Sequence, residues 1–236
     1  MRIVLPPSET KTPGGVEGTA LSWEGLAVPG LAPTRQDVAE RLVALAEDSE
    51  ATKKALGLGA KGDEWVLANR ELLTSPVMPA IDRYTGVLFD ALGVDTLDES
   101  ARAIADQRVW LFSALFGPIR ATDLIPRYRL SFDSKLPGLS LKAHWLPHAE
   151  QIWAGEFTLD LRSEGYRGLA PLPEGAGVFV RVVKDLGKAV PAGHANKGTK
   201  GRLVRELVTS GVSLSSRDEF LQWADGAGWR CAAVED

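Results

Sequence analysis

Hydrophobic and polar positions follow two different periods along the chain. Short apolar runs at Arg2–Leu5, Val109–Ala114 and Gly177–Lys184 predict buried strands, because each is a few residues long and bounded by polar or turn-forming residues. From Thr34 to about Leu73 the apolar positions recur instead at helical spacing. The Gly- and Pro-rich stretch Thr12–Pro33 between these regions predicts a long loop.

The same patterns extend over the rest of the chain. They predict helices over Pro79–Leu92, Asp98–Asp106, Gly198–Ser210 and Ser216–Ala224, a helix beginning near Pro147 within Leu141–Trp153, and strands over Tyr128–Phe132 and Trp229–Val234. Strands spaced by helices favour a mixed α/β or α+β fold, with a mixed central sheet flanked by helices. No repeat or linker interrupts the pattern, so one domain is expected over residues 1–236.

Composition and charge narrow the class of protein. The 236 residues are 44% hydrophobic, enough for a sizeable core, and no apolar run approaches the roughly 18 residues of a membrane span. The single cysteine, Cys231, excludes an intrachain disulfide and is expected as a buried strand residue. We therefore expect a cytoplasmic protein without a membrane partner.

The net charge of −4 is unevenly distributed. Residues 1–107 carry 10 basic and 17 acidic side chains, residues 108–205 carry 15 and 8, and residues 206–236 carry 2 and 6. An acidic protein with one basic middle segment is typical of a local anion site rather than a wholly basic surface.

The segment Phe112–Leu130 concentrates this charge. After an apolar stretch and a Gly-Pro turn, Arg120, Arg127 and Arg129 are expected to surround Asp123. Arginine forks suit phosphate and carboxylate groups, so the segment is a candidate anion site. A solvated charged loop explains the same pattern equally well.

Two glycine-containing motifs each allow a functional interpretation and a purely structural one. Gly57–Gly62 matches GxGxxG, but it follows a predicted helix rather than a strand, so the dinucleotide-binding reading fails. It is closer to a helix-hairpin-helix, whose amides can contact a DNA phosphate, although a plain connection with glycine caps fits too.

The second motif, Gly193–Lys200, resembles a P-loop with its Lys and Thr transposed, which argues against ATPase activity. A helix beginning near Gly198 would still present its amides and dipole to an anion. Its loop and first turns carry the cations Lys197, Lys200, Arg202 and Arg205. Arg202 and Glu206 could equally form an ordinary helix pair.

Neither a metal site nor a cofactor is predicted. His144 and His148 are four residues apart, but Pro147 is expected to start a helix that leaves His144 outside it. Polar groups at the predicted strand end, Ser8 to Lys11, and at the polar tip Arg83-Tyr84-Thr85-Gly86 are instead candidates to line a site.

Taken in order, these segments resemble the YaaA peroxide-stress family. The matching blocks are LPPSETK at Leu5–Lys11, RYTGVLFDAL at Arg83–Leu92, FSALFGPIRATDLIPRYRL at Phe112–Leu130, DLRSEGY at Asp160–Tyr166 and ANKGTKGRLVR at Ala195–Arg205. The resemblance implies an α/β domain with a positively charged cleft, resistance to hydrogen peroxide through limitation of reactive iron, and binding of duplex DNA. The cleft residues that it implies are Ser8, Lys11, Tyr84, Thr85, Ser113, Arg120, Asp123, Tyr128, Arg129, Ser163, Lys197 and Arg205.

Three departures from the family pattern reduce positive charge. Many members have Ser-Pro-Ala-Lys where this chain has Pro6–Glu9, one cation is lost within Lys197–Gly201, and Asp160 replaces an asparagine. Weaker DNA affinity than the family implies is therefore expected.

Two functional hypotheses follow. In the first, the protein binds duplex DNA without sequence specificity through Arg120, Arg127, Arg129, Lys197, Lys200, Arg202 and Arg205. In the second, it is an enzyme acting on a small anionic, nucleotide- or nucleoside-like substrate, with Ser8, Glu9, Lys11 and Asp123 as candidate catalytic residues and Tyr84, Thr85, Ser113, Tyr128 and Ser163 lining the cleft. A closed pocket favours the enzyme and an open basic groove favours DNA. In a third interpretation the arginines are structural and the protein acts through a partner.

Overall fold

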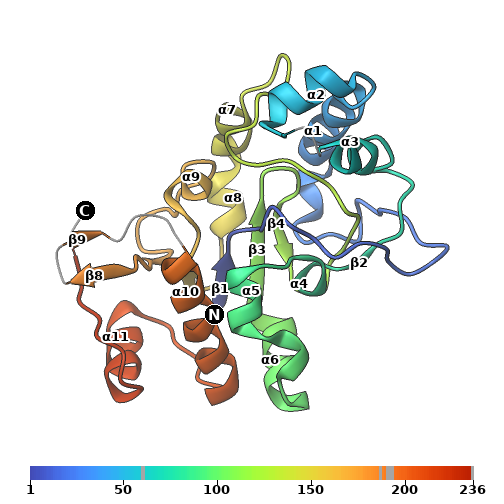
Figure 1. Cartoon of the computed structure of the whole chain (residues 1–236). Coiled ribbons are helices and arrows are strands. Elements are labelled where there is room, and N and C mark those ends of the chain that lie inside the picture. Colours follow the sequence, from blue (N-terminus) through green and yellow to red (C-terminus); the bar gives the residue numbers. More distant parts are fainter. Residues whose placement is uncertain (60–61, 186–187, 190–193, 235–236) are drawn as a thin grey trace.

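A five-stranded sheet forms the centre of the computed structural model, which describes residues 1–59, 62–185, 188–189 and 194–234 (Figure 1). Its order is β4-β3-β1-β6-β7. The strands are β1 (Arg2–Leu5), β3 (Val109–Ser113), β4 (Gly117–Arg120), β6 (Thr158–Asp160) and β7 (Gly177–Phe179). All neighbours are parallel except β3 and β4, which form an antiparallel hairpin. The expected mixed α/β fold is therefore confirmed.

The register places the strand ends along common edges. Val4 pairs with Trp110 on one side and with Asp160 on the other, so β1, β3, β6 and β7 end together at what we call the carboxyl edge. The hairpin returns in the opposite direction and brings Arg120 opposite Trp110, toward the amino ends of the parallel strands.

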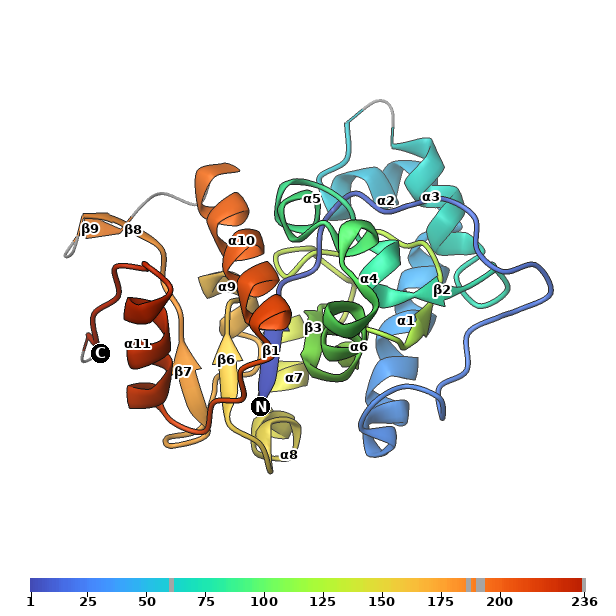
Figure 2. The same ribbon diagram turned by 90° about the horizontal axis from the view of Figure 1, so that it is seen from below.

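Helices cover both faces of the sheet (Figure 2). On one face lie α5 (Val87–Leu92), α6 (Glu99–Arg108) and α10 (His194–Ser210), and α10 packs closely against α5. On the other face lie α7 (Leu141–Trp145), the 3₁₀ turn η3 (Leu146–His148) and α8 (Ala149–Trp153), where the rings of Trp145 and Trp153 pack against Phe112 of β3.

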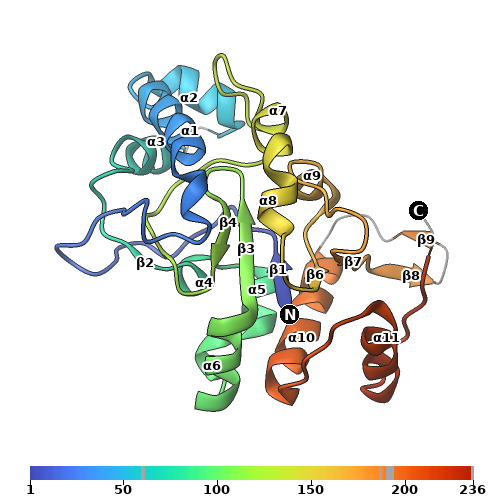
Figure 3. The ribbon, with the colours of Figure 1, turned by 180° about the vertical axis from the view of Figure 1, so that it is seen from behind.

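The remaining elements lie around this centre. Beyond the carboxyl edge are α2 (Ser49–Leu56), α3 (Asp63–Arg70) and α9 (Glu164–Arg167), toward the top of Figure 3. The others are η1 (Pro29–Leu31), α1 (Ala32–Leu45), α4 (Ala80–Arg83), η2 (Val94–Thr96), α11 (Arg217–Gly226), the pair β2 (Met78–Pro79) and β5 (Leu124–Ile125), and the pair β8 (Val183–Asp185) and β9 (Lys188–Ala189).

Side-chain caps explain where several helices begin. Asp48, Asp98 and Ser216 each accept a hydrogen bond from a backbone N–H in the first turn of the helix that follows, which satisfies one of its free donors. Gly57 ends α2 in the left-handed conformation that glycine adopts without strain.

Two predicted strands are absent from the described structure. Residues 128–132 form no strand, because the Asn69 side chain forms hydrogen bonds with the backbone of Arg129. Its Nδ2 donates to the Arg129 carbonyl and its Oδ1 accepts from the Arg129 N–H. Residues 229–234 also lie outside any strand, and Cys231 is exposed rather than buried.

Two further predictions change in detail. The run Gly177–Lys184 divides into β7 and β8, because pairing with β6 stops at the bond from the Val180 N–H to the Asp160 carbonyl. Pro147 lies in the 3₁₀ turn between α7 and α8, so His144 is inside a helix and not outside it.

None of the helices in the described parts of the chain is both long and apolar enough to span a membrane.

Candidate functional site

The order of the strands creates a switch point at β1 and β6. The connection from β1 to β3 ends in α6 on one face of the sheet, whereas the connection from β3 to β6 ends in α7 and α8 on the other. Open α/β sheets bind ligands at such a point, outside the carboxyl ends of the strands. The segments that follow Leu5 and Asp160 are therefore the first place to look for a site.

Lys11, in the segment after β1, is buried beneath the carboxyl edge. Its residue is only 6% exposed, and its Nζ lies 4.3 Å from the ring centre of Tyr128, 5.1 Å from that of Tyr84 and 5.9 Å from that of Trp65. The Nζ donates to the Ser8 carbonyl at 2.9 Å and, more weakly, to the Glu9 carbonyl at 3.5 Å. Lys11 thus occupies an aromatic cage closed by its own loop.

The charges around this amine are unusual for a buried lysine. Burial lowers the pKa of Lys11 well below its ordinary value, and the positive charges of Arg129, Arg127 and Arg83 lower it further, whereas Glu9 acts in the opposite direction. No carboxylate among the described residues lies within ion-pair distance of Nζ. The cage is therefore electropositive and favours an uncharged amine.

Two arginines of the Phe112–Leu130 segment lie beside this cage. Arg129 forms a 2.8 Å ion pair with the exposed Glu9. The Arg127 guanidinium stacks 4.1 Å from the Trp65 ring centre and pairs with Glu64 at 2.7 Å. The buried Nε of Arg127 finds no hydrogen-bond acceptor within the described ranges. Both arginines could exchange an exposed carboxylate for an anionic ligand.

A chain of hydroxyl groups continues from the cage to β3. The Tyr84 and Tyr128 hydroxyls are 2.7 Å apart, and the Tyr128 hydroxyl donates to Ser113 Oγ at 2.7 Å. Ser113 Oγ also accepts the N–H groups of Leu115 and Phe116. Burial raises the pKa of Tyr128 to about 12 and raises that of Tyr84 as well, so both remain proton donors at neutral pH.

The loop after β1 is fixed to the start of α5 by short polar contacts. Ser8 Oγ accepts from the Thr85 N–H and donates to the Thr10 carbonyl, and Thr85 Oγ1 donates to Thr10 Oγ1. The structure thus brings together Ser8, Lys11, Tyr84, Thr85, Ser113 and Tyr128, which the sequence placed in three separate blocks.

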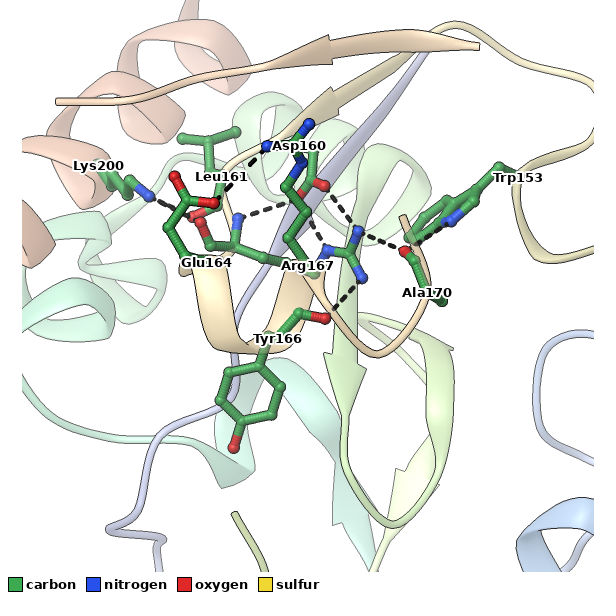
Figure 4. Close-up of polar contacts among 9 residues, drawn as sticks. Trp153, Asp160, Leu161, Glu164, Tyr166, Arg167, Ala170 and Lys200 are labelled. Carbon is green, nitrogen blue, oxygen red and sulfur yellow. Dashed lines mark hydrogen bonds and ion pairs between the residues drawn. The ribbon is translucent and has the colours of Figure 1, made fainter. Parts of the chain in front are cut away.

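Beside β1, the end of β6 carries a fully buried ion pair. Asp160 accepts two hydrogen bonds from the Arg162 guanidinium at 2.8 and 2.7 Å. That guanidinium lies over the rings of Phe112 and Trp153 and also donates to the carbonyls of Tyr166 and Ala170. Figure 4 shows Asp160, Tyr166, Ala170 and Trp153 gathered about this point. The negative charge of Asp160 is therefore balanced by Arg162 inside the protein and does not face an open site.

Lys200 of α10 reaches the same loop. Its Nζ donates to the carbonyls of Leu161 and Arg162, and Figure 4 shows it directed at Leu161. Burial lowers the pKa of Lys200 to about 8, opposed by the charges of Asp160 and Glu164. The nearby Ser163 begins α9, but its side chain makes no cap bond there.

Arg120 and Asp123 lie elsewhere. Asp123 Oδ2 accepts the N–H groups of Ala27 and Arg120, so this carboxylate fixes two loops and is not ringed by the three arginines as expected. Arg120 is exposed near Trp110, toward the amino ends of the strands.

The predicted cations of α10 divide into two groups. Lys200 is buried, and Arg205 donates to the carbonyls of Leu92 and Gly93 and to Thr96, so both hold the fold together. The helix begins at His194 and not near Gly198 as expected, so Lys197 lies in its first turn and Arg202 near its middle, and both are exposed. Between α5 and α10 lies an open hollow of about 610 Å³ lined by Val87, Asp90, Ala91, Ala195, Gly198, Thr199 and Arg202. Gly193, the first residue of the P-loop-like motif, lies outside the described residues.

The Gly57–Gly62 segment connects α2 to α3, as the hairpin reading expects, and its Ala60 and Lys61 lie outside the described residues. The histidines serve the fold: the Nε2 atoms of His144 and His148 contact the Thr34 carbonyl and hydroxyl at the start of α1. In the described part of the chain no group of three His, Cys, Asp or Glu side chains is arranged to hold a metal ion.

Sequence reasoning missed Trp65 and the Asp160–Arg162 pair. Trp65 lies on a helix 54 positions from Lys11 in the chain, and no local pattern links the two. Arg83 belongs to the predicted polar tip Arg83–Gly86, and in the structure its guanidinium donates to the Thr12 carbonyl.

Several UPF0246 proteins are similar to this chain. A UPF0246 protein of Corynebacterium efficiens is 41% identical over 235 residues, covering 97% of this chain and 93% of its own length. A UPF0246 protein of Streptomyces coelicolor is 41% identical over 244 residues, covering 99% and 92%. A UPF0246 protein of Lactobacillus delbrueckii is 33% identical over 158 residues, covering 63% and 64%.

The family described as "Peroxide stress protein YaaA" matches residues 1–233. The match spans both halves of the switch point, from the loop after β1 to α10. The chain therefore belongs to the YaaA family of peroxide stress proteins.

Proposed function

We propose that this peroxide-stress-related protein binds and acts on a small anionic molecule at the carboxyl edge of its sheet. The observation that carries the proposal is the surroundings of Lys11. It is a buried amine in an aromatic cage, it is flanked by Arg127, Arg129 and Arg83, and no carboxylate in the described ranges pairs with it. Such clusters of like charge destabilise a fold, and strongly shifted titratable groups in them mark functional sites.

An anion would relieve this unfavourable arrangement. Entering beside Arg129, it would replace the exposed Glu9 and place a negative charge near Lys11. Ser8, Thr10 and Thr85 supply hydroxyl groups along the same loop. These hydroxyl and arginine groups are more numerous than the binding of a single phosphate requires. They favour a substrate that itself carries several polar groups.

Calorimetric titration of the full chain tests the proposal. The probes are inorganic phosphate, nucleoside monophosphates and pyruvate, each in two buffers of different ionisation enthalpy. Because a bound anion raises the proton affinity of Lys11, binding should take up protons and weaken as pH rises. Lys11→Met should lose this proton uptake, whereas the remote Arg120→Ala should keep it. Binding that is unaffected by Lys11→Met would overturn the proposal.

Binding of duplex DNA is a second candidate function. Its support is the α2–α3 hairpin, with the left-handed Gly57 at its turn, together with the exposed cations Lys197 and Arg202 on α10. Amides at such a turn can contact one phosphate, and free cations add contacts without base specificity.

Fluorescence anisotropy with a labelled duplex at two salt concentrations measures this second function. Gly57→Val should disturb the turn and weaken binding, and the matched control Gly226→Val lies in open space on α11. Equal binding by both variants would remove the hairpin from the DNA-binding surface.

A further inference from the structure

Lys11 has the surroundings of an amine that forms a covalent bond. Desolvation in an apolar site and nearby cations both keep a lysine uncharged, and an uncharged amine is a nucleophile. Both conditions hold here: the three rings of Trp65, Tyr84 and Tyr128 face Nζ, and Arg127 and Arg129 lie alongside.

We propose that Lys11 forms an imine with the carbonyl carbon of a small anion such as a 2-oxo acid, whose carboxylate is held by Arg129 and Arg127. This inference rests on the anion site proposed above and names both the class of its ligand and the bond that forms. Arg129 would release Glu9 to the solvent, and the unpartnered Nε of Arg127 would gain an acceptor.

The step balances without a further reactant. The Nζ lone pair forms a C–N bond while the carbonyl π electrons move to oxygen, which takes a proton as the nitrogen gives one up. The carbinolamine then loses its hydroxyl with a second proton as water while the nitrogen lone pair completes the C=N bond, and the nitrogen gives up its remaining proton, so that the two protons of the amine balance those of the water. The paired hydroxyls of Tyr84 and Tyr128, on rings that face Nζ, are placed to donate and recover these protons.

Lys200 provides an internal comparison. It is also a buried lysine, but its neighbouring charges are the acids Asp160 and Glu164, and two carbonyl oxygens accept from its Nζ. The arginine whose carbonyl accepts from this Nζ, Arg162, is bound to Asp160 and is not free to hold a carboxylate. Lys200 is therefore expected to stay unmodified under conditions that modify Lys11.

Reductive trapping tests the inference. The full chain is incubated with pyruvate and sodium cyanoborohydride, digested, and mapped by mass spectrometry. The expected result is a reduced adduct on Lys11 that saturates with pyruvate concentration and is absent at Lys200. Acetone, which has the carbonyl but no carboxylate, should give no saturable adduct.

Two variants separate binding from bond formation. Lys11→Arg removes the nucleophilic amine and should abolish the adduct. Arg129→Gln keeps the amine and should reduce labelling at low pyruvate by about tenfold, the effect of losing a charge-assisted hydrogen bond. The wild-type map decides the case even if a variant fails to fold.

The outcomes distinguish this inference from the proposed function. Anion binding by calorimetry without an adduct on Lys11 overturns the imine and leaves the anion site standing. Adducts spread over exposed lysines without saturation also overturn the imine. A saturable adduct confined to Lys11 supports both.

Discussion

Two buried lysines show how the same residue type acquires different properties. Around Lys11 the nearby arginines add to desolvation, whereas around Lys200 the acids Asp160 and Glu164 oppose it. Burial therefore lowers the pKa of Lys200 to about 8 against the pull of these acids, whereas burial and the arginines act in the same direction to lower the pKa of Lys11 well below its ordinary value. The charged neighbours of a buried lysine therefore determine whether its amine stabilises the fold or is available to a ligand.

The stability that depends on Lys200 should rise with pH. Because its pKa is lowered from 10.5 to about 8 by folding, the unfolded chain binds more protons than the native protein between these values. The free energy of unfolding should therefore increase across this window, by up to about 3 kcal/mol relative to Lys200→Met. Urea denaturation at a series of pH values measures the difference.

Lys197→Met is the control, since it removes an exposed ammonium from the same helix. Its free energy of unfolding should follow that of the wild type through the window. A constant difference between wild type and Lys200→Met at all pH values would show that Lys200 titrates alike in the folded and unfolded chains.

Breaking the Asp160–Arg162 pair should cost far more than breaking an exposed pair. Asp160→Asn leaves the fully buried Arg162 guanidinium without a counter-charge, and we expect a loss of about 3–5 kcal/mol in the free energy of unfolding. Glu164→Gln breaks the exposed pair with Arg181 and should cost less than about 1 kcal/mol. Denaturation of both variants gives the comparison, and equal losses would contradict it.

Caps and periodicity located most helices, but they did not locate every strand. Asp98 and Ser216 stand where their sequence patterns predict helix starts, because a cap acts on the residues next to it. Residues 128–132 have a strand-like pattern, yet their backbone is held by Asn69, a residue 60 positions away in the chain from Arg129. A strand needs a partner edge, and no local pattern supplies one.

The β3–β4 turn depends on a glycine for two separable reasons. Gly117 has a φ of +61°, and a Cβ there would lie 2.5 Å from the buried ring of Trp145. Gly57 has a φ of +62° with nothing within 4 Å of its Cβ position. Both alanine variants carry the backbone strain, but only Gly117→Ala adds overpacking, so we expect it to lose about 1–3 kcal/mol more stability. Thermal unfolding of the two variants measures this, and similar losses would mean that Trp145 moves aside freely.

Across the whole molecule, folding redistributes the basic segment that the sequence revealed. The sequence identified most residues of the candidate site at the carboxyl edge, because they follow predicted strand ends or belong to the blocks that match the family. It did not reveal that Arg205 would bind carbonyl groups, nor that Arg120 would lie toward the opposite edge from Lys11. Charge counts along a chain give no position in space, and so the excess of cations over residues 108–205 overstates the surface that is free for phosphates.

The salt dependence of DNA binding should report this difference. If all seven predicted cations met phosphates, the logarithm of the binding constant would fall with the logarithm of salt concentration with a slope of about −6. Arg127 and Arg129 are paired with acids, and Lys200 and Arg205 are bound to carbonyls. Lys197 and Arg202 remain exposed together on α10, which predicts a slope of about −2.

Anisotropy titrations with a labelled duplex measure the slope, and the double variant Lys197→Ala/Arg202→Ala should bring it close to zero. Arg120→Ala should leave it unchanged, because Arg120 lies toward the amino ends of the strands. A slope near −6 would mean that the paired and buried cations exchange their internal partners for phosphates, and the cage around Lys11 would then open onto the DNA.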